Sequence, residues 1–208
     1  DKTNQYGVFV LAGPNARSVL QKIADADISN GSFKWLSMQE IPIGFCPKVR
    51  AMRVNFVGSL GWELHHPIEY QLQLFEALQE AGAEFEIENV GMRAMDSMRL
   101  EKSYRLWGTD LNAENSALEA NLQRFIKLNK GEFTGRQALV EQQEQGVPNK
   151  FCTIEIEAND ADSFGNEPII IDGKVVGRGT SGGYGHFIRK SLMLGYIESN
   201  YANIGQEC

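Results

Sequence analysis

The most informative stretch of this sequence is Phe56-Val57-Gly58-Ser59-Leu60-Gly61-Trp62-Glu63-Leu64. Its glycines bound a short turn, and the residues that follow the turn, 62–66, read as a strand. Residues 48–57, on the other side of the turn, are also extended in character. Because successive side chains of a strand point to opposite faces, Glu63 is predicted to face away from Trp62 and Leu64.

Two interpretations of Glu63 follow from that alternation. In the first, which the pattern alone favours, Glu63 is a solvated carboxylate at the edge of a sheet. In the second, Glu63 is a partly buried carboxylate beside aromatic residues. Such a group can accept two N–H bonds from the flat edge of a 2-amino-pyrimidinone, which is a charge-assisted and geometrically specific pair.

Hydrophobic spacing predicts further elements on both sides of this segment. Residues 8–11 read as a buried strand that Gly13 and Pro14 end. Helices are predicted from apolar residues spaced by three and four positions. They comprise Ala16, Val19, Leu20 and Ile23 after an Asn15 cap; Leu72, Phe75 and Leu78 between Pro67 and Gly82; Met92, Met95, Met98 and Leu100 within 91–104; a short helix near 118–125; and Ala138 and Leu139 after a Thr134 cap.

The pattern changes to strands after Pro148. Residues 151–157, 168–171, 174–176 and 192–197 are strand-like, and Asp172-Gly173 is a signal for a two-residue hairpin turn. The predicted fold class is therefore α+β. A first domain is expected over residues 1–146, and a small antiparallel β-barrel over residues 147–208.

The composition is that of a globular protein, with 42% hydrophobic and 23% charged residues. Because the net charge is −7 and the basic residues are scattered, we expect no nucleic-acid partner. No stretch approaches roughly 18 consecutive apolar residues, so we expect no membrane role. Cys46, Cys152 and Cys208 are odd in number and widely spaced, which argues against a disulfide framework. Reduced thiols indicate the cytoplasm, or the mitochondrial matrix in a eukaryote.

Two motifs suggest sites that their context does not favour. Residues 177–182 match the dinucleotide-binding pattern GxGxxG, but that site needs a helix after the third glycine. A strand follows here, so glycines at a tight β-turn are the better interpretation. His65 and His66 are adjacent, so a strand would point them to opposite sides and not at one metal ion. No metal site is predicted.

Residues 56–64 resemble the signature of the tetrahydrofolate-binding aminomethyltransferase family, typified by the glycine-cleavage T-protein. Blocks at 96–110, 127–139, 180–182 and 194–196 are similar to the same family and stand in the same order. The resemblance implies a partial aminomethyltransferase folate-binding domain, truncated at its start, followed by a β-barrel domain that lacks its last strand. A piece of a longer protein is also expected because the chain opens at Asp1 without a Met.

Residues 101–108 and 182–192 are similar to the dehydrogenases of the dimethylglycine and sarcosine type. In that group an N-terminal FAD domain oxidises an N-methyl amine, and a folate domain captures the iminium carbon as 5,10-methylenetetrahydrofolate. The resemblance implies that this chain is the folate domain, with tetrahydrofolate as its cofactor and FAD in an upstream domain.

Other functions within the superfamily stay open. One is a free-standing T-protein-like aminomethyltransferase, and another is a non-catalytic folate-binding module. A branch that assists iron–sulfur cluster assembly is disfavoured, because Glu132 stands where that branch carries a cysteine.

The resemblance also implies the residues of the site. The folate-binding positions are Phe56, Glu63, Arg93, Tyr104 and Trp107. Phe56 replaces a family tyrosine and keeps its stacking face, while Ser59 replaces a glutamate and Met95 an arginine. The family's catalytic aspartate lies before Asp1. We therefore expect no catalytic residue in this chain, and no turnover by the chain alone.

Overall fold

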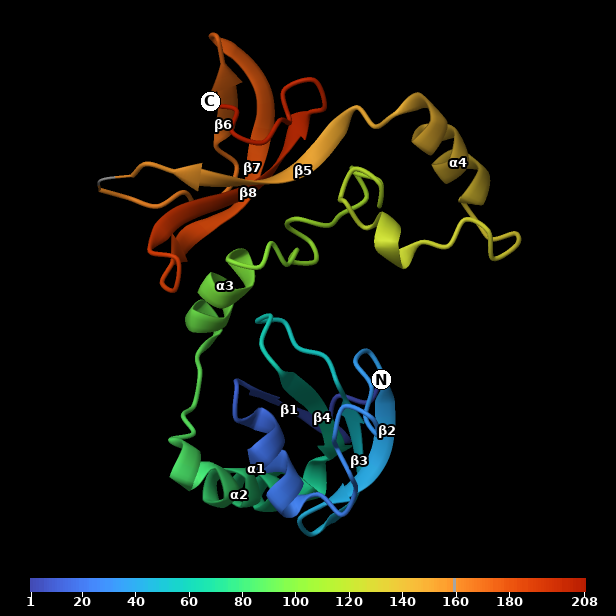
Figure 1. Cartoon of the computed structure of the whole chain (residues 1–208), viewed down its shortest axis with the longest axis vertical. Coiled ribbons are helices and arrows are strands. Elements are labelled where there is room, and N and C mark those ends of the chain that lie inside the picture. The colour runs from blue at the N-terminus through green and yellow to red at the C-terminus, as the bar shows by residue number, and fades with distance from the viewer. Residues whose placement is uncertain (159) are drawn as a thin grey trace. The chain divides into compact units, whose positions relative to one another are not determined.

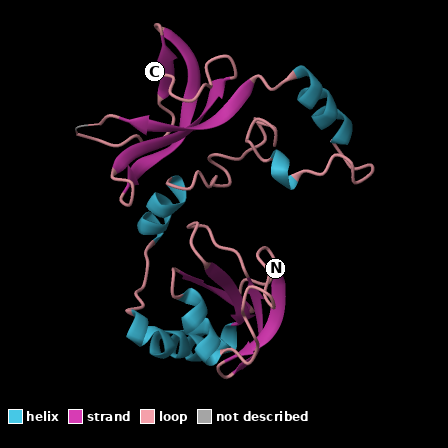
Figure 2. Ribbon diagram, viewed as in Figure 1, coloured by secondary structure: helices cyan, strands magenta, loops and turns pink. Residues whose placement is uncertain are grey.

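The computed structural model describes residues 1–158 and 160–208 (Figures 1 and 2). The chain divides into two compact units, Asp1–Met95 and Asp96–Cys208. Each unit contains a four-stranded antiparallel sheet with helices, which confirms the predicted α+β class. Residues 96–146 belong to the second compact unit, so the units divide at a different place from the predicted sequence domains 1–146 and 147–208. Those domain boundaries stay a prediction.

The first unit is a sheet with the strand order β1-β4-β3-β2 and two helices on one of its faces. Two short 3-10 turns, Ile68–Tyr70 and Ala83–Phe85, flank the second helix. The elements are β1 (Tyr6–Ala12), α1 (Ala16–Ile23), β2 (Met38–Ile43), β3 (Cys46–Met52), β4 (Gly61–Pro67) and α2 (Gln71–Gly82).

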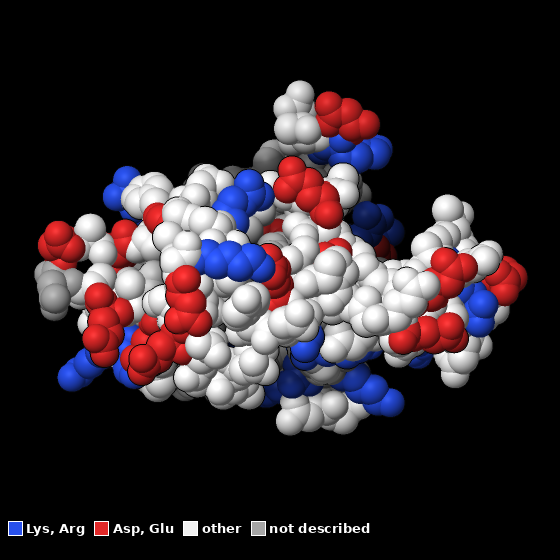
Figure 3. Space-filling view, turned by 90° about the horizontal axis from the view of Figure 1, so that it is seen from above, with Lys and Arg blue, Asp and Glu red and all other residues white. Residues whose placement is uncertain are grey.

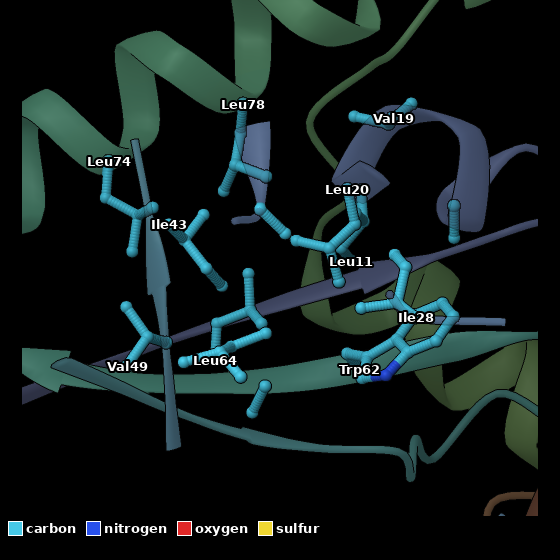
Figure 4. Close-up of a cluster of buried hydrophobic side chains, with 14 of the residues drawn as sticks. Leu11, Val19, Leu20, Ile28, Ile43, Val49, Trp62, Leu64, Leu74 and Leu78 are labelled. Atoms are coloured by element: carbon cyan, nitrogen blue, oxygen red, sulfur yellow. The ribbon is translucent and has the colours of Figure 1, made fainter. Parts of the chain in front are cut away.

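The core of the first unit lies between this sheet and the two helices (Figure 4). Val19 and Leu20 of α1 and Leu74 and Leu78 of α2 pack on the side chains of the sheet. From β4 the residues turned to this core are Trp62, Leu64 and His66, all fully buried. Burial of a large apolar side chain stabilises a fold by about 1.5–3 kcal/mol, so this row fixes which face of β4 is covered.

Several predicted details of the first unit are wrong. The sequence reading missed β2. Asn15 makes no capping hydrogen bond through its side chain. Leu72 is 67% exposed, whereas Leu74 is buried. The reason is that each residue advances about 100° around a helix, so Leu72 lies about 120° from the buried Leu78, whereas Leu74 lies about 40° from it.

The second unit is a sheet with the strand order β5-β8-β7-β6. Strand β8 is apolar on both faces: Leu192, Leu194 and Tyr196 join one core cluster, while Met193 and Ile197 join another. Helix α3 begins in the last residues of the first unit. The elements are α3 (Met92–Leu100), α4 (Arg136–Gln145), β5 (Asn149–Ile156), β6 (Pro168–Ile171), β7 (Lys174–Gly185) and β8 (Lys190–Glu198).

The hairpin prediction in this unit is confirmed, and two helix predictions are wrong. Asp172 and Gly173 join β6 to β7 with φ of 50° and 75°, as a two-residue turn requires. Near 118–125 the chain forms turns and a 3-10 turn, Gln123–Phe125, in place of a helix. Helix α4 is preceded by Gly135 and has no side-chain cap from Thr134.

The glycines of residues 177–182 lie inside β7 and not at a tight turn, which corrects that prediction. Their absent side chains allow close backbone approach: a Cβ on Gly177 would collide with the carbonyl oxygen of Tyr196. No helix follows, so the dinucleotide-binding interpretation finds no support in this strand.

A buried ion pair joins α3 to the second sheet. The Arg99 guanidinium donates to Asp110 Oδ2 at 2.7 Å, and both side chains are almost fully buried. The same guanidinium donates to Asp96 at 2.6 Å, to the Tyr104 carbonyl at 3.0 Å and to Ser181 Oγ at 2.9 Å. Every side of the guanidinium is therefore hydrogen-bonded, which is the condition for burying a charge without a large penalty.

A β-bulge completes the surroundings of Asp110. Gly179 pairs with Gly195 and Ser181 with Leu194, so Thr180 is one residue in excess on β7. Thr180 Oγ1 and Ser181 Oγ both donate to Asp110 Oδ1. Consecutive residues of a regular strand point to opposite faces, so the bulge is what brings both hydroxyls to one carboxylate.

We expect Asp110→Asn to lower the free energy of unfolding of the second unit by about 3–5 kcal/mol, because it leaves the buried Arg99 charge uncompensated. Asp96→Asn is the matched control. The Asp96 side chain is 47% exposed, so its loss should cost less than about 1 kcal/mol. Urea unfolding followed by circular dichroism measures both, and equal costs for the two variants would contradict the assignment.

The buried Tyr196 hydroxyl should make the free energy of unfolding fall at high pH. Its hydroxyl donates to the Asp110 carbonyl at 2.8 Å. Burial, assisted by the Asp110 charge, raises the pKa of Tyr196 to about 12 from 10.0. Because the folded pKa is the higher one, the contribution of neutral Tyr196 is complete below pH 10.0 and is lost as pH rises towards 12.

Relative to Tyr196→Phe, the wild-type chain should therefore lose up to about 1 kcal/mol of stability between pH 9 and pH 11. The measurement is urea unfolding of both chains at the two pH values. If the difference in stability between wild type and Tyr196→Phe does not change with pH, the phenol has the same pKa in the folded and unfolded states, which would contradict the prediction.

Candidate functional site

Glu63 lies in the middle of β4, on the face of the first sheet opposite to α1 and α2. Val10 of β1 and Met52 of β3 are its cross-strand neighbours. The Glu63 side chain is 30% exposed, and Val10 is exposed beside it. The carboxylate is therefore half-buried within a row of apolar neighbours, on a face that α1 and α2 leave uncovered.

His65 lies two residues further along the same face. Its Nε2 is 3.3 Å from Glu63 Oε2, and the His65 side chain is 33% exposed. The next residue, His66, points into the core, where its Nδ1 lies 2.9 Å from the Leu64 carbonyl oxygen and its ring stacks on Phe9. The prediction that the two histidines face opposite sides of a strand is confirmed.

Phe56 lies in the turn that leads from β3 to β4. The turn is shaped by Asn55, whose Oδ1 accepts the backbone N–H groups of Val57 and Gly58, each at 2.9 Å. Gly58 has a φ of 74°, a conformation that glycine adopts without strain. Phe56 is half-exposed and makes contacts of its own. The structure places Phe56 and Glu63 in one unit, on a turn and on the strand that follows it.

Tyr104 and Trp107 lie in the second unit, on the loop after α3. Asp110 Oδ2 accepts the backbone N–H of Leu106 at 2.7 Å, and Arg99 binds the Tyr104 carbonyl, so the buried ion pair holds this loop in place. Trp107 is 82% exposed at the end of that anchored loop. The network explains how a large aromatic side chain is presented to solvent on a fixed backbone.

Arg93 is exposed in the first turn of α3, at the end of the first unit. Met95, where the family carries an arginine, is half-buried on the same helix. The parts of Arg93, Phe56, Tyr104 and Trp107 in ligand binding stay predictions.

Sequence reasoning missed the pairing of His65 with Glu63. The signal was present, because residues at positions i and i+2 of a strand lie on the same face. The adjacency of His65 and His66 instead suggests a test for a metal site, which involves Glu63 in no way.

Charged side chains of both signs lie on the face that Figure 3 shows. On the face shown in Figure 3, acidic and basic side chains are intermixed and neither sign forms a continuous area. Within residues 1–158 and 160–208, no group of three His, Cys, Asp or Glu could hold a metal ion. Over the same described residues, every helix is too short or too polar to cross a membrane.

Known proteins share both the sequence and the fold of this chain. Human mitochondrial dimethylglycine dehydrogenase is 41% identical over 206 residues, which are 99% of this chain and 24% of that protein. Mouse mitochondrial sarcosine dehydrogenase is 37% identical over 198 residues, 95% of this chain and 21% of that protein. The chain thus spans about a quarter of the length of these relatives.

A solved structure covers nearly the whole chain. The glycine cleavage system aminomethyltransferase T from Bartonella henselae superposes with a TM-score of 0.83 at 25% identity, over 97% of this chain and 54% of that one. The GCVT N-terminal domain model matches residues 1–130, and the glycine cleavage T-protein C-terminal barrel domain model matches residues 149–208. Because the first of these models alone covers more than half of its length, the chain belongs to the glycine cleavage T-protein family.

Proposed function

We propose that this chain is the folate-binding part of an FAD-linked N-methyl amine dehydrogenase of the dimethylglycine or sarcosine type. Its task would be to hold tetrahydrofolate while an iminium carbon is captured as 5,10-methylenetetrahydrofolate. The observation that carries the proposal is the half-buried Glu63 carboxylate on the uncovered face of the first sheet. The 41% identity to a dimethylglycine dehydrogenase supports the type of enzyme.

Glu63 fits the pterin end of a folate by charge and by shape. An ionised carboxylate is an acceptor only, and its two oxygens match the adjacent ring N–H and amino N–H of a 2-amino-pyrimidinone. Val10 and Met52, which flank Glu63 in the sheet, offer an apolar surface against which a flat ring can pack. A half-buried position strengthens the pair relative to one in open solvent.

The other proposed folate contacts rest on the family resemblance. Phe56 offers an aromatic face without the hydroxyl of the family's tyrosine. Tyr104 and Trp107 offer two more aromatic groups on the loop that Arg99 and Asp110 anchor. Stacking on aromatic faces suits the flat ring systems of a folate.

The chemistry divides between this chain and what it would bind. Tetrahydrofolate, when bound, supplies the two amine nitrogens that take up the one-carbon unit. The residues described here would bind and orient the folate, and we assign none of them a proton-transfer role. FAD would be held, and the amine oxidised, by a part of the protein outside these 208 residues. The dehydrogenase relatives are named as mitochondrial, which supports a matrix location in a eukaryote.

A free-standing aminomethyltransferase is the second candidate. The TM-score of 0.83 to an aminomethyltransferase T supports it at the level of the fold, which the two functions share. The identity of 41% to the dehydrogenase favours the dehydrogenase. A non-catalytic folate-binding module is the remaining alternative. It would bind folate through Glu63 but show no turnover, even within the full-length protein.

Glu63→Gln should weaken folate binding by roughly thirty- to a hundredfold, which corresponds to about 2–3 kcal/mol. One carboxylate oxygen becomes an amide N–H₂ that opposes a donor of the ligand and leaves a desolvated group unpaired. Calorimetric titration of 5-formyltetrahydrofolate into the full-length protein measures the dissociation constant.

Glu40→Gln is the matched control. Glu40 is a carboxylate of the same sheet, and its ion-pair partners are Lys48 and Arg50. It should change the affinity by less than about twofold. Wild-type affinity in a folded Glu63→Gln protein would return Glu63 to the role of a solvated surface carboxylate.

The 208-residue chain alone should not accelerate methylenetetrahydrofolate formation from tetrahydrofolate and formaldehyde. The reason is that the aspartate which the family uses in catalysis is expected outside this chain. Comparison of the rates with and without the chain is the measurement, and a rate above the uncatalysed one would show that the chain carries a catalytic group of its own.

A further inference from the structure

We propose that His65 is a positioning residue for Glu63, which fixes the carboxylate in the orientation that takes a pair of adjacent N–H donors. This inference rests on the proposed function of Glu63 as the acceptor of a pterin edge. It adds a second residue to that site and a reason for the selectivity of the site.

The geometry of the pair sets the direction of its hydrogen bond. His65 Nε2 lies 3.3 Å from Glu63 Oε2. A carboxylate oxygen can only accept, so Nε2 carries the hydrogen and donates it, whether the imidazole is neutral or charged. The second carboxylate oxygen, Oε1, is left for a ligand.

The sheet holds the two side chains on one face, within reach of each other. Glu63 and His65 are i and i+2 residues of β4, the strand between β1 and β3, so their backbones are held on both sides. Arg50 is the cross-strand neighbour of His65, but its guanidinium lies 3.5 Å from Glu40 and over the ring of Tyr6. The nearby positive charge is therefore engaged elsewhere, and His65 is the side chain that contacts Glu63.

A fixed carboxylate is a better receptor for a flat ligand than a mobile one. Each oxygen has two acceptor positions, so Oε2 can hold His65 on one side and a ligand N–H on the other. The bond from His65 restricts rotation of the carboxylate, and that restriction lowers the entropy lost when a ligand binds. The site should consequently favour ligands with two adjacent N–H donors, the 2-amino-pyrimidinone class, over ligands with a single donor.

A double-mutant cycle in the full-length protein tests the proposal, with 5-formyltetrahydrofolate as the probe in calorimetric titrations. The variants are His65→Leu, His65→Gln, Glu63→Gln and Glu63→Gln combined with His65→Leu. We expect His65→Leu to weaken binding about fivefold, the typical effect of one lost hydrogen bond to a charged group at a half-exposed site. His65→Gln, whose amide N–H₂ can reach the same oxygen, should restore affinity to within about twofold of wild type.

The decisive comparison is His65→Leu in the Glu63→Gln background, where it should change the affinity by less than about twofold. If the two losses multiply instead, His65 acts on the ligand or the fold directly, and the positioning role is overturned. A His65→Gln protein as weak as His65→Leu would also overturn it, because the hydrogen bond would then not be the cause.

Two further results separate this inference from the proposed function. In the first result, the His65→Leu protein binds the probe with wild-type affinity while the Glu63→Gln protein binds it weakly. That result would reject the role of His65 and leave Glu63 as the folate acceptor. Wild-type affinity of Glu63→Gln would reject both. Arg50→Gln is the matched control for loss of a positive charge in the same cross-strand row: it should bind within about twofold of wild type, and a loss equal to that of His65→Leu would overturn the proposal.

Discussion

Strand β4 can take only one register, and the first unit depends on that constraint. A shift by one residue would turn Trp62 and Leu64 out of the core and turn Glu63 and His65 into it. Burying an unpaired carboxylate costs several kcal/mol, and exposing two large apolar side chains costs a similar amount again. Because β4 lies between β1 and β3, the same choice sets which side chains of those strands surround Glu63. Packing on one face of the sheet therefore determines that Glu63 and His65 lie on the other face.

In the second unit, a buried ion pair helps to hold an irregular segment on the sheet. Residues 101–122 are mostly turns and irregular structure, and within them Leu111, Ala120 and Leu122 pack on the core of this unit. Arg99 and Asp110 add polar anchors to that contact: together they bind backbone atoms of Tyr104 and Leu106 and a hydroxyl of β7. Such a network is costly unless every member is satisfied, and here each one is. It keeps Trp107 in place although that ring has little protein around it.

The sequence predicted best where one strong pattern governed a segment. Residues 62–66 alternate cleanly, so the face of Glu63 was predicted from the sequence alone, and Asp172-Gly173 identified its turn through backbone conformations that few residue pairs adopt. Leu72 is misplaced because steps of three residues drift around a helix, whereas the inward pair, Leu74 and Leu78, is spaced by four. The glycines of residues 177–182 were misread because their role is to let backbones approach, a property of the partner strand β8. The contact of His65 with Glu63 is predictable in principle, because residues i and i+2 of a strand share a face.

Because Thr180 is an extra residue on β7, the length of that strand is coupled to the buried charge. Removing one codon there would restore regular pairing with β8, yet it would leave room for only one hydroxyl at Asp110. An added codon would shift the other glycines of β7 away from the positions where β8 passes closest. Loops tolerate insertions and deletions better than strands do, and the bulge further ties the number of residues in β7 to the buried carboxylate. Insertions and deletions in this family member should therefore accumulate in the loops around β7 and leave the strand itself untouched.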